Sequence, residues 1–263
     1  QYARWESSMR TKKEIPQIDG QLCFDLNTNS DNFVVQANEL IEGKQSLKLN
    51  SAKIMRTLIM QIRPDDEDLK SYVVSVQELA QLLGVPSANL YRDMDEITTD
   101  ILTNHVAIKD PKNKKFLKIQ WVSACAYEKK VGLAVKMNPL LKPFLLNLKE
   151  HYTQYQLENI LAMKSVYAIR IYEMLMKEQI IKFLPRGGQD ILLSIKAIRE
   201  ACDCEDKYAK ISQFKERVLD IAAKEIERCT TYKVSYDCKK TGRTITHINF
   251  HVCYKFVQNS AKI

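Results

Sequence analysis

The order of the predicted helices and strands is the strongest constraint on this fold, because the same order occurs twice. In the first half, the stretch LNSAKIMRTLIMQI has apolar residues at positions 54, 58 and 62, the spacing of a helical stripe. The β-branched stretch SYVVSV and two more helical segments follow, and after them come three β-rich stretches, HVAIKD, FLKIQWVSACAYE and VGLAVKMN. In the second half, MKSVYAIRIYEMLMKE predicts a helix, QDILLSI a strand, SIKAIREACDC and SQFKERVLDIAAKEIERCT two helices, and YKVSYD and TITHINFHV two strands. The repeated order predicts two copies of one α+β module, although sequence identity between the halves is negligible.

The two helical segments of the first half, in SVQELAQLLGVPSANLYRDMDEITTDILTN, meet at a tight turn. Ser75, with Glu78 three residues later, fits a capping box at the start of the first segment. Gly84 and Pro86 then interrupt the helical pattern, and Ser87 is placed to cap the second segment. This pattern is typical of a helix-turn-helix, although an ordinary helical hairpin produces it too. With the strands that follow, it predicts a winged helix, so the chain is expected to contain two tandem winged-helix domains.

The domain boundaries follow from where the pattern starts and repeats. Residues 1–30 are polar and aperiodic, which predicts a flexible N-terminal arm. We expect the first winged-helix domain at 31–140, a helical connector at 141–163 and the second winged-helix domain at 164–263. The connector contains no Gly/Ser-rich linker, so the two domains should be packed or stiffly joined.

Composition and charge narrow the classes of partner. The net charge is +8 and the pI is about 9.0, which favours an anionic partner, nucleic acid before membrane. The chain has no apolar run long enough for a membrane helix and no signal-peptide core, so we expect a cytoplasmic protein. Its seven cysteines are odd in number and lack Cys-x-x-Cys pairs, which argues against disulfides and zinc. No Gly-rich phosphate loop is present, and we expect neither metal nor cofactor.

The long helix of the second module has two chemically different faces. Its apolar face should belong to the core and contains Phe214, Val218, Ile221, Ala222 and Ile226. In a winged helix the third helix enters the major groove, where Gln can pair with adenine and Arg with guanine. We therefore predict that the polar face contacts DNA through Ser212, Gln213, Arg217 and Lys224. Of these, Gln213 and Arg217 are expected to read bases. Asp220 on the same face can pair with Arg217 or Lys224 and hold either away from the groove. Each residue alone would also fit a solvated surface.

Cations flank this helix on both sides. Lys207 and Lys210 lie just before it, where backbone amides also favour phosphate. The stretch YDCKKTGRTITHINFHV predicts a β-hairpin whose turn, with Thr-Gly at its centre, carries Lys239, Lys240 and Arg243. In a winged helix such a hairpin lies along a phosphate strand. These five cations are therefore expected to contact the DNA backbone.

The corresponding helix of the first module, SANLYRDMDEITTD, carries one cation, Arg92, against four carboxylates. Only its N-terminal end, with Ser87, Asn89 and Arg92, suits DNA, and the rest suits a protein surface. A lysine-rich turn between two later strands adds three candidate DNA contacts, Lys112, Lys114 and Lys115. We therefore expect the first module to share its work between DNA and a protein partner or a second copy of the chain.

Three stretches resemble the iteron-binding plasmid replication initiators: VVQANELIEG, YTQYQLENILAMKSVYAIRIYEMLMKE and FKERVLDIAAKEIERCTTYKVSYDCKKTGRTITHINFHV. The resemblance spans roughly residues 33–255. It implies two winged-helix domains that bind repeated double-stranded sites at a plasmid origin as monomers. It also implies homodimers that bind an operator and repress the initiator's own gene, and recruitment of the host replication initiator and the replicative helicase. In this family the second domain dominates site recognition and the first carries the dimer interface.

Two alternatives stay open at this point. Some plasmid initiators nick DNA with a His-x-His metal pair and a catalytic tyrosine. In HINFH, His247 and His251 are four residues apart, which is about 13 Å along a strand at about 3.3 Å per residue. Such a pair cannot share one metal ion, so we expect no catalytic residues and no enzyme activity. The second alternative is a transcriptional repressor of the same fold, which differs in what it recruits.

Overall fold

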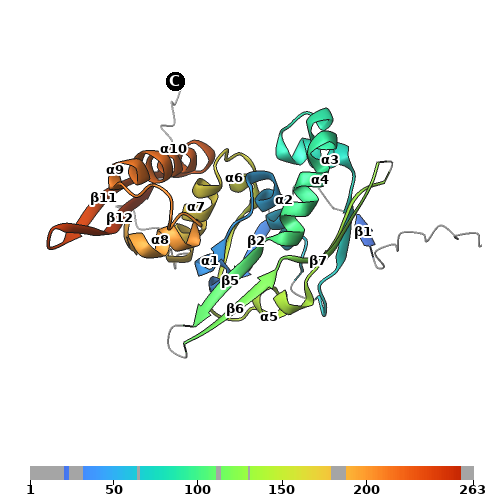
Figure 1. Ribbon diagram of the computed structural model, residues 1–263, viewed down its shortest axis with the longest axis horizontal. Helices are drawn as coiled ribbons and strands as arrows, with labels where there is room; N and C mark the ends of the chain where they lie inside the picture. Colours follow the sequence, from blue (N-terminus) through green and yellow to red (C-terminus); the bar gives the residue numbers. More distant parts are fainter. Residues whose placement is uncertain are drawn as a thin grey trace, which may run out of the picture.

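A computed structural model describes residues 21–23, 32–63, 66–110, 114–129, 131–178 and 188–255. The part of the chain from residue 166 onward, coloured dark yellow to red in Figure 1, forms one end of an elongated body, and the part before it forms the rest. Within the described ranges, no helix has both the length and the apolar character needed to cross a membrane.

The helices of the first half lie where their periodicity predicts them. They are α1 (Asn38–Glu42), α2 (Leu49–Met60), α3 (Val76–Leu83) and α4 (Ser87–Thr103), with strand β4 (Ser71–Val74) ahead of α3. The capping box of Ser75 and Glu78 is confirmed, and Gly84 ends α3 with a left-handed φ of 65°. The predicted cap at Ser87 is wrong. Pro86 is the extended residue before α4, its carbonyl accepts from the amides of Asn89 and Leu90, and Ser87 is already helical.

Apart from one two-stranded pair given below, the described strands of the first half form two sheets. One sheet has the order β1-β4-β8-β7 and contains the wing hairpin of β7 (Val122–Glu128) and β8 (Gly132–Met137). The second has the order β3-β5-β6, with strands Lys44–Gln45, His105–Asp110 and Lys115–Gln120. The stretch from 116 to 128, predicted as one β-rich run, is divided at the fully buried Trp121 between these two sheets. Of the expected N-terminal arm, only β1 (Gln21–Cys23), which pairs with β4, lies in the described residues.

The segment expected to be a helical connector is not helical throughout. A 3₁₀ turn η1 (Pro139–Leu141) and two short helices, α5 (Lys142–Leu145) and α6 (Leu157–Leu161), flank strand β9 (Tyr152–Gln156). Strand β9 alternates exposed and buried residues and pairs antiparallel with β2 (Phe33–Ala37), which lies over a hundred residues earlier. The connector is thereby tied to the start of the first module. The exact domain boundaries stay predictions.

The second half repeats the winged-helix order. Helix α7 (Val166–Glu178) is followed by β10 (Gln189–Ser194), by α8 (Ile195–Ala201), which is capped by Ser194, and by a long helix from 211 to 229. Strands β11 (Tyr232–Thr241) and β12 (Thr244–Tyr254) complete a sheet of order β10-β12-β11. Only Gly242 and Arg243 form the hairpin turn, with Gly242 at a left-handed φ of 61°. The predicted turn is too wide, because the pairing of β11 with β12 continues past Lys239 and Lys240.

Helix α7 belongs to the cores of both halves. It is buried from Ala168 to Met176 and lies between α10 (Asp220–Cys229) and α1, as Figure 1 shows. Near its centre, Glu173 accepts hydrogen bonds from Arg56 of α2, and Arg170 donates to the carbonyls of Ile41 in α1 and of Gly43 just after it. The two halves are therefore packed together rather than loosely tethered.

Candidate nucleic-acid interface

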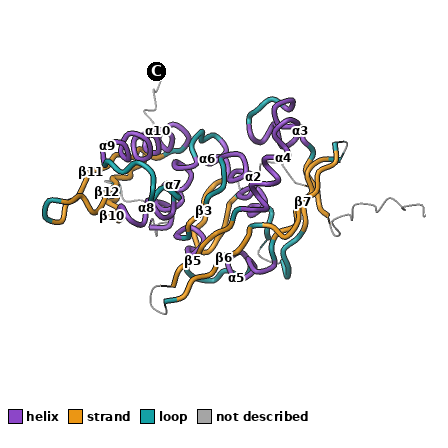
Figure 2. The backbone as a smooth tube through the Cα atoms, in the orientation of Figure 1, coloured by secondary structure: helices purple, strands orange, loops and turns teal. Residues whose placement is uncertain are grey.

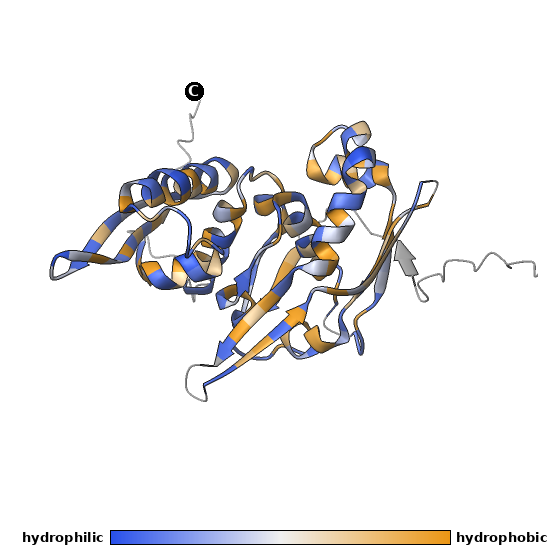
Figure 3. Cartoon of the chain, in the orientation of Figure 1, coloured by the Kyte–Doolittle hydropathy of each residue, from blue (hydrophilic) through white to orange (hydrophobic). Residues whose placement is uncertain are grey.

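The long helix of the second module consists of α9 (Ile211–Phe214), a π-helical segment η2 (Lys215–Leu219) and α10. Figure 2 shows it as one continuous helix along the upper edge of the molecule, and Figure 3 shows hydrophilic and hydrophobic residues interspersed along it. Its core-facing side chains form what we call the buried row, which consists of Phe214, Val218, Ala222 and Ile226. Each of these is at most 1% exposed. Leu219 is buried beside this row.

The prediction that Ile221 belongs to the core is wrong, since this side chain is 37% exposed. An α-helix turns by about 100° per residue, so positions twelve apart, such as 214 and 226, would point about 120° apart. The π segment takes up one extra residue and reduces this angle to about 20°. The buried row can therefore recur every four residues. The residues just before it form an exposed outer row of Gln213, Arg217 and Ile221.

The predicted DNA contacts on this helix and just before it are exposed, namely Lys207, Lys210, Ser212, Gln213, Arg217 and Lys224. Arg217 Nε lies 3.6 Å from Glu216 Oε1. Both side chains are exposed, so this ion pair holds the Arg217 side chain only weakly. Asp220 does not hold Arg217 or Lys224, because its carboxylate accepts a hydrogen bond from the Tyr236 hydroxyl at 2.5 Å. Burial and this hydrogen bond raise the pKa of Tyr236. Asp220 is thus directed toward β11.

Arg199 of α8 is a supporting residue that sequence reasoning missed. Its guanidinium donates to the carbonyls of Cys204, Lys207 and Tyr208, and it lies 4.2 Å from the ring centroid of Phe214. It therefore holds the turn between α8 and α9, which carries Lys207 and leads to Lys210. The only signal in the sequence was a cation near the end of a helix, which is too common to single out.

The wing cations Lys239, Lys240 and Arg243 are all exposed. Lys239 and Lys240 lie on β11 itself, and the register with β12 shifts between them because β12 has an extra residue, Thr246. Such a bulge increases local twist and re-aims side chains. The structure therefore places these cations on the same module as the outer row, on an extended hairpin that projects from one end of the molecule (Figure 1).

In the first module, Asn89 and Arg92 are exposed and Ser87 is half-buried at the start of α4. Arg92 Nε pairs with Asp93 Oδ1 at 2.9 Å. Two of the carboxylates on α4 take part in contacts that hold the fold together. Lys48, just before α2, bonds to Glu96 through its ammonium group and to Asp100 through its amide. These partners are about fifty residues away along the chain, which is why the sequence pattern did not reveal them.

The lysine-rich turn of the first module is not brought together with the start of α4. Lys114 and Lys115 lie at the end of the β5–β6 hairpin, which points away from α3 and α4 to the opposite side of the view in Figure 1. Lys112 lies outside the described residues. Lys114 and Lys115 therefore lie on a different side of the molecule from the start of α4 (Figure 1).

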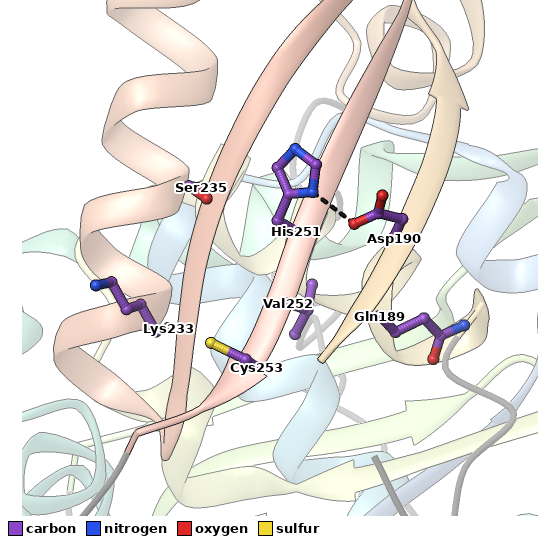
Figure 4. A pocket seen from close by; sticks show the side chains of 7 residues that line it. All are labelled: Gln189, Asp190, Lys233, Ser235, His251, Val252 and Cys253. Carbon is purple, nitrogen blue, oxygen red and sulfur yellow. Dashed lines mark hydrogen bonds and ion pairs between the residues drawn. The ribbon is translucent and has the colours of Figure 1, made fainter. Parts of the chain in front are cut away.

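The outer face of the β10-β12-β11 sheet carries a pocket, lined by Gln189, Asp190, Lys233, Ser235, His251, Val252 and Cys253 (Figure 4). His251 bonds to Asp237 at 2.9 Å and to Asp190 at 2.5 Å, and these hydrogen bonds raise its pKa. His247 lies on the same strand and contacts Thr246 instead. Within the described part of the chain, no group of three or more His, Cys, Asp or Glu side chains is arranged to hold a metal ion.

Comparison with known proteins matches both halves of the chain. The family model described as "Initiator Replication protein, WH1" matches residues 33–176, and "Initiator Rep protein, WH2" matches residues 194–252. A replication initiation protein of Escherichia coli is 25% identical over 227 residues, which cover 85% of this chain and 70% of that protein. The crystal structure of Pi initiator protein in complex with iteron DNA aligns with a TM-score of 0.71 and 19% identity. That alignment covers 87% of this chain and 99% of the other. The α+β fold of two tandem winged helices is confirmed.

Proposed function

Because the chain belongs to the initiator replication protein family, with both its WH1 and WH2 domains, we propose that it is a sequence-specific, double-stranded DNA-binding plasmid replication initiator. It binds repeated sites at a plasmid origin in the cytoplasm. The Pi initiator, whose fold it shares, was solved in complex with iteron DNA, which supports this assignment.

The observation that carries the proposal is the surface around the long helix of the second module. Gln213 and Arg217 are exposed on the outer row, and both types of side chain can bond base edges through two atoms at once. Exposed lysines precede the helix, and three more cations lie on the hairpin after it. Such a surface can place polar side chains in a groove while its flanks neutralise phosphates.

The rigid connection of the two modules adds a geometric expectation. Helices α4 and α9 belong to modules that share the core helix α7, so their separation is set by packing. Major-groove entries on one face of DNA recur about every 10 base pairs. One copy of the chain should therefore protect about two turns of DNA, with most base contacts from the second module.

Hydroxyl-radical footprinting of the DNA that flanks the gene tests this function. We expect protection of tandem repeats, about two turns at each. Protection confined to a single inverted repeat, without any repeated sites, would favour the repressor alternative. Site-specific nicking of supercoiled origin DNA in Mg²⁺ or Mn²⁺ would instead show that the protein is an enzyme, contrary to our expectation.

A homodimer that represses the protein's own gene is the second part of the proposal, and we place its interface on β6. This strand is the edge of the β3-β5-β6 sheet, and its Phe116 and Leu117 are 72% and 45% exposed. Unpaired edge strands with apolar side chains readily pair with a second chain. Phe116→Lys should shift sedimentation toward the monomer and weaken operator binding. Leu140→Lys, at another exposed apolar residue, is the matched control and should not.

The host replication initiator and the replicative helicase are the remaining proposed partners. Asp95 and Glu96 are exposed in the middle of α4, beyond the end that suits DNA, and they support a protein-binding role for that surface. Asp95→Lys should weaken capture of the purified helicase or host initiator while leaving binding to origin DNA unchanged. Equal capture by the variant and the unaltered chain would move the recruiting surface elsewhere.

A further inference from the structure

We propose that Ile221 is a specificity-determining residue that reads the 5-methyl group of a thymine in the major groove. This inference rests on the proposed DNA-binding function and adds an apolar contact to the polar ones on the same helix. Ile221 belongs to the outer row with Gln213 and Arg217, and Lys224 is exposed one turn further along.

The local helix geometry singles out Ile221. It is the large apolar side chain exposed on the long helix, at a position that regular α-helical periodicity would bury. The π segment redirects it outward, while Leu219 is buried instead. Segments of π-helix are rare and occur often at functional sites. An isoleucine kept in water gains nothing from this arrangement, whereas one that meets an apolar ligand does.

The charges around Ile221 leave its approach to DNA open. Asp220, its neighbour, is bonded to Tyr236 of β11. Glu225, one turn later, bonds to the amide of Lys164 and to Arg228. These two carboxylates are thus held by the protein, and the nearest residues on the groove side are cationic. A thymine methyl is the apolar group that base pairs present in the major groove, so it is the ligand that fits.

The position of Ile221 relative to Arg217 predicts how far the thymine lies from the guanine along the DNA. The two residues are four apart, about 6 Å along the helix at about 1.5 Å per residue. Base pairs are stacked about 3.4 Å apart. The thymine should therefore lie one or two base pairs from the guanine that Arg217 reads.

Affinity for single methyl groups tests the inference directly. The full chain would first be used to select a consensus from a random duplex library. Each thymine of that consensus would then be replaced singly by uracil, which lacks only the methyl group, and affinity measured by fluorescence anisotropy. We expect one position at which the replacement weakens binding about fourfold, the factor expected for one buried methyl group. In Ile221→Ala, uracil at this position should weaken binding by less than about 1.5-fold, because the partner of the methyl is gone. Ile221→Val should show an intermediate effect.

Leu192→Ala is the matched control, since Leu192 is 58% exposed on β10 of the same module but lies on the sheet rather than on the helix. It should retain the full uracil effect. If the library yields no enriched sequence, the proposed function fails and this inference fails with it. If a consensus is found but Ile221→Ala keeps every uracil effect, or no thymine shows one, the inference alone is overturned.

Discussion

Replacing Arg56 with Met should destabilise the whole chain, because Arg56 ties the first half to the second inside the core. The side chains of Arg56 and Glu173 are both 0% exposed. Glu173 accepts from Arg56 Nε at 2.9 Å and from its Nη2 at 3.0 Å, and also from Arg170 and the Tyr155 hydroxyl. Methionine is unbranched and flexible, so it can fill much of the vacated volume and leave the loss of charge as the main change.

The magnitude follows from what remains after the substitution. Removing one partner of a buried ion pair leaves the other charge poorly compensated and costs about 3–5 kcal/mol. The lowered pKa of Glu173 shows that these partners stabilise its charged form. Burial alone would raise this pKa, but the charges of Arg56 and Arg170, with the hydrogen bonds from Arg56 and the Tyr155 hydroxyl, lower it from 4.5 to about 2. A difference of that size corresponds to about 3 kcal/mol of folding free energy, to which Arg56, Arg170 and Tyr155 contribute together.

The same pKa fixes the direction of the pH dependence. Because the folded-state pKa of Glu173 is depressed, its contribution is complete above about pH 4.5 and is lost as the pH falls toward about 2. Arg56→Met removes one of the two cations that depress this pKa. The variant should therefore lose the contribution at a higher pH than the unaltered chain does.

Urea unfolding at several pH values, followed by tryptophan fluorescence, measures both effects. Arg92→Met is the matched control, since it removes an exposed arginine with a single carboxylate partner, and it should leave the unfolding free energy unchanged. In a Glu173→Gln background, Arg56→Met should cost much less than in the unaltered chain. A decrease below about 1 kcal/mol with an unchanged acid limb would refute the reasoning, because it would mean that the pair is not buried and charged as described.

Three further predictions concern DNA binding and the shared core. The triple variant Lys239→Ala, Lys240→Ala and Arg243→Ala should bind specific and random DNA more weakly and flatten the log–log salt dependence by about 0.9 for each phosphate that is no longer neutralised; an unaltered slope would show that the hairpin does not touch DNA. Arg217→Ala should cost about 1–3 kcal/mol on the cognate site and relax selection at one base pair, whereas equal weakening on random DNA would identify Arg217 as a phosphate-binding residue. A fragment of residues 164–263 should unfold at lower urea than the full chain, because its central helix is without its buried partners from the first half; equal midpoints would show that the second module is independent.

Much of the candidate site could be predicted because it depends on short-range rules. The capping box of Ser75 and Glu78 joins residues three apart, and the structure contains it. Exposure of Gln213 and Arg217 followed from their place opposite the apolar residues of the same helix. Where one local irregularity intervened, the reasoning failed: a single π turn exchanged Leu219 for Ile221 in the core. Periodicity assumes a constant rotation per residue, so it cannot anticipate such an insertion.

The sequence by itself determined the order of helices and strands in both modules, because turn residues, caps and apolar periodicity act over a few residues. Only the tertiary structure decided which strands share a sheet and how the modules join. Strand β2 pairs with β9, and Arg56 reaches Glu173 at a separation of 117 residues. No local pattern encodes such partners, since a buried arginine and an exposed one have the same letter in the sequence. Their burial is decided by which surfaces meet when the chain folds, and that depends on packing over the whole molecule.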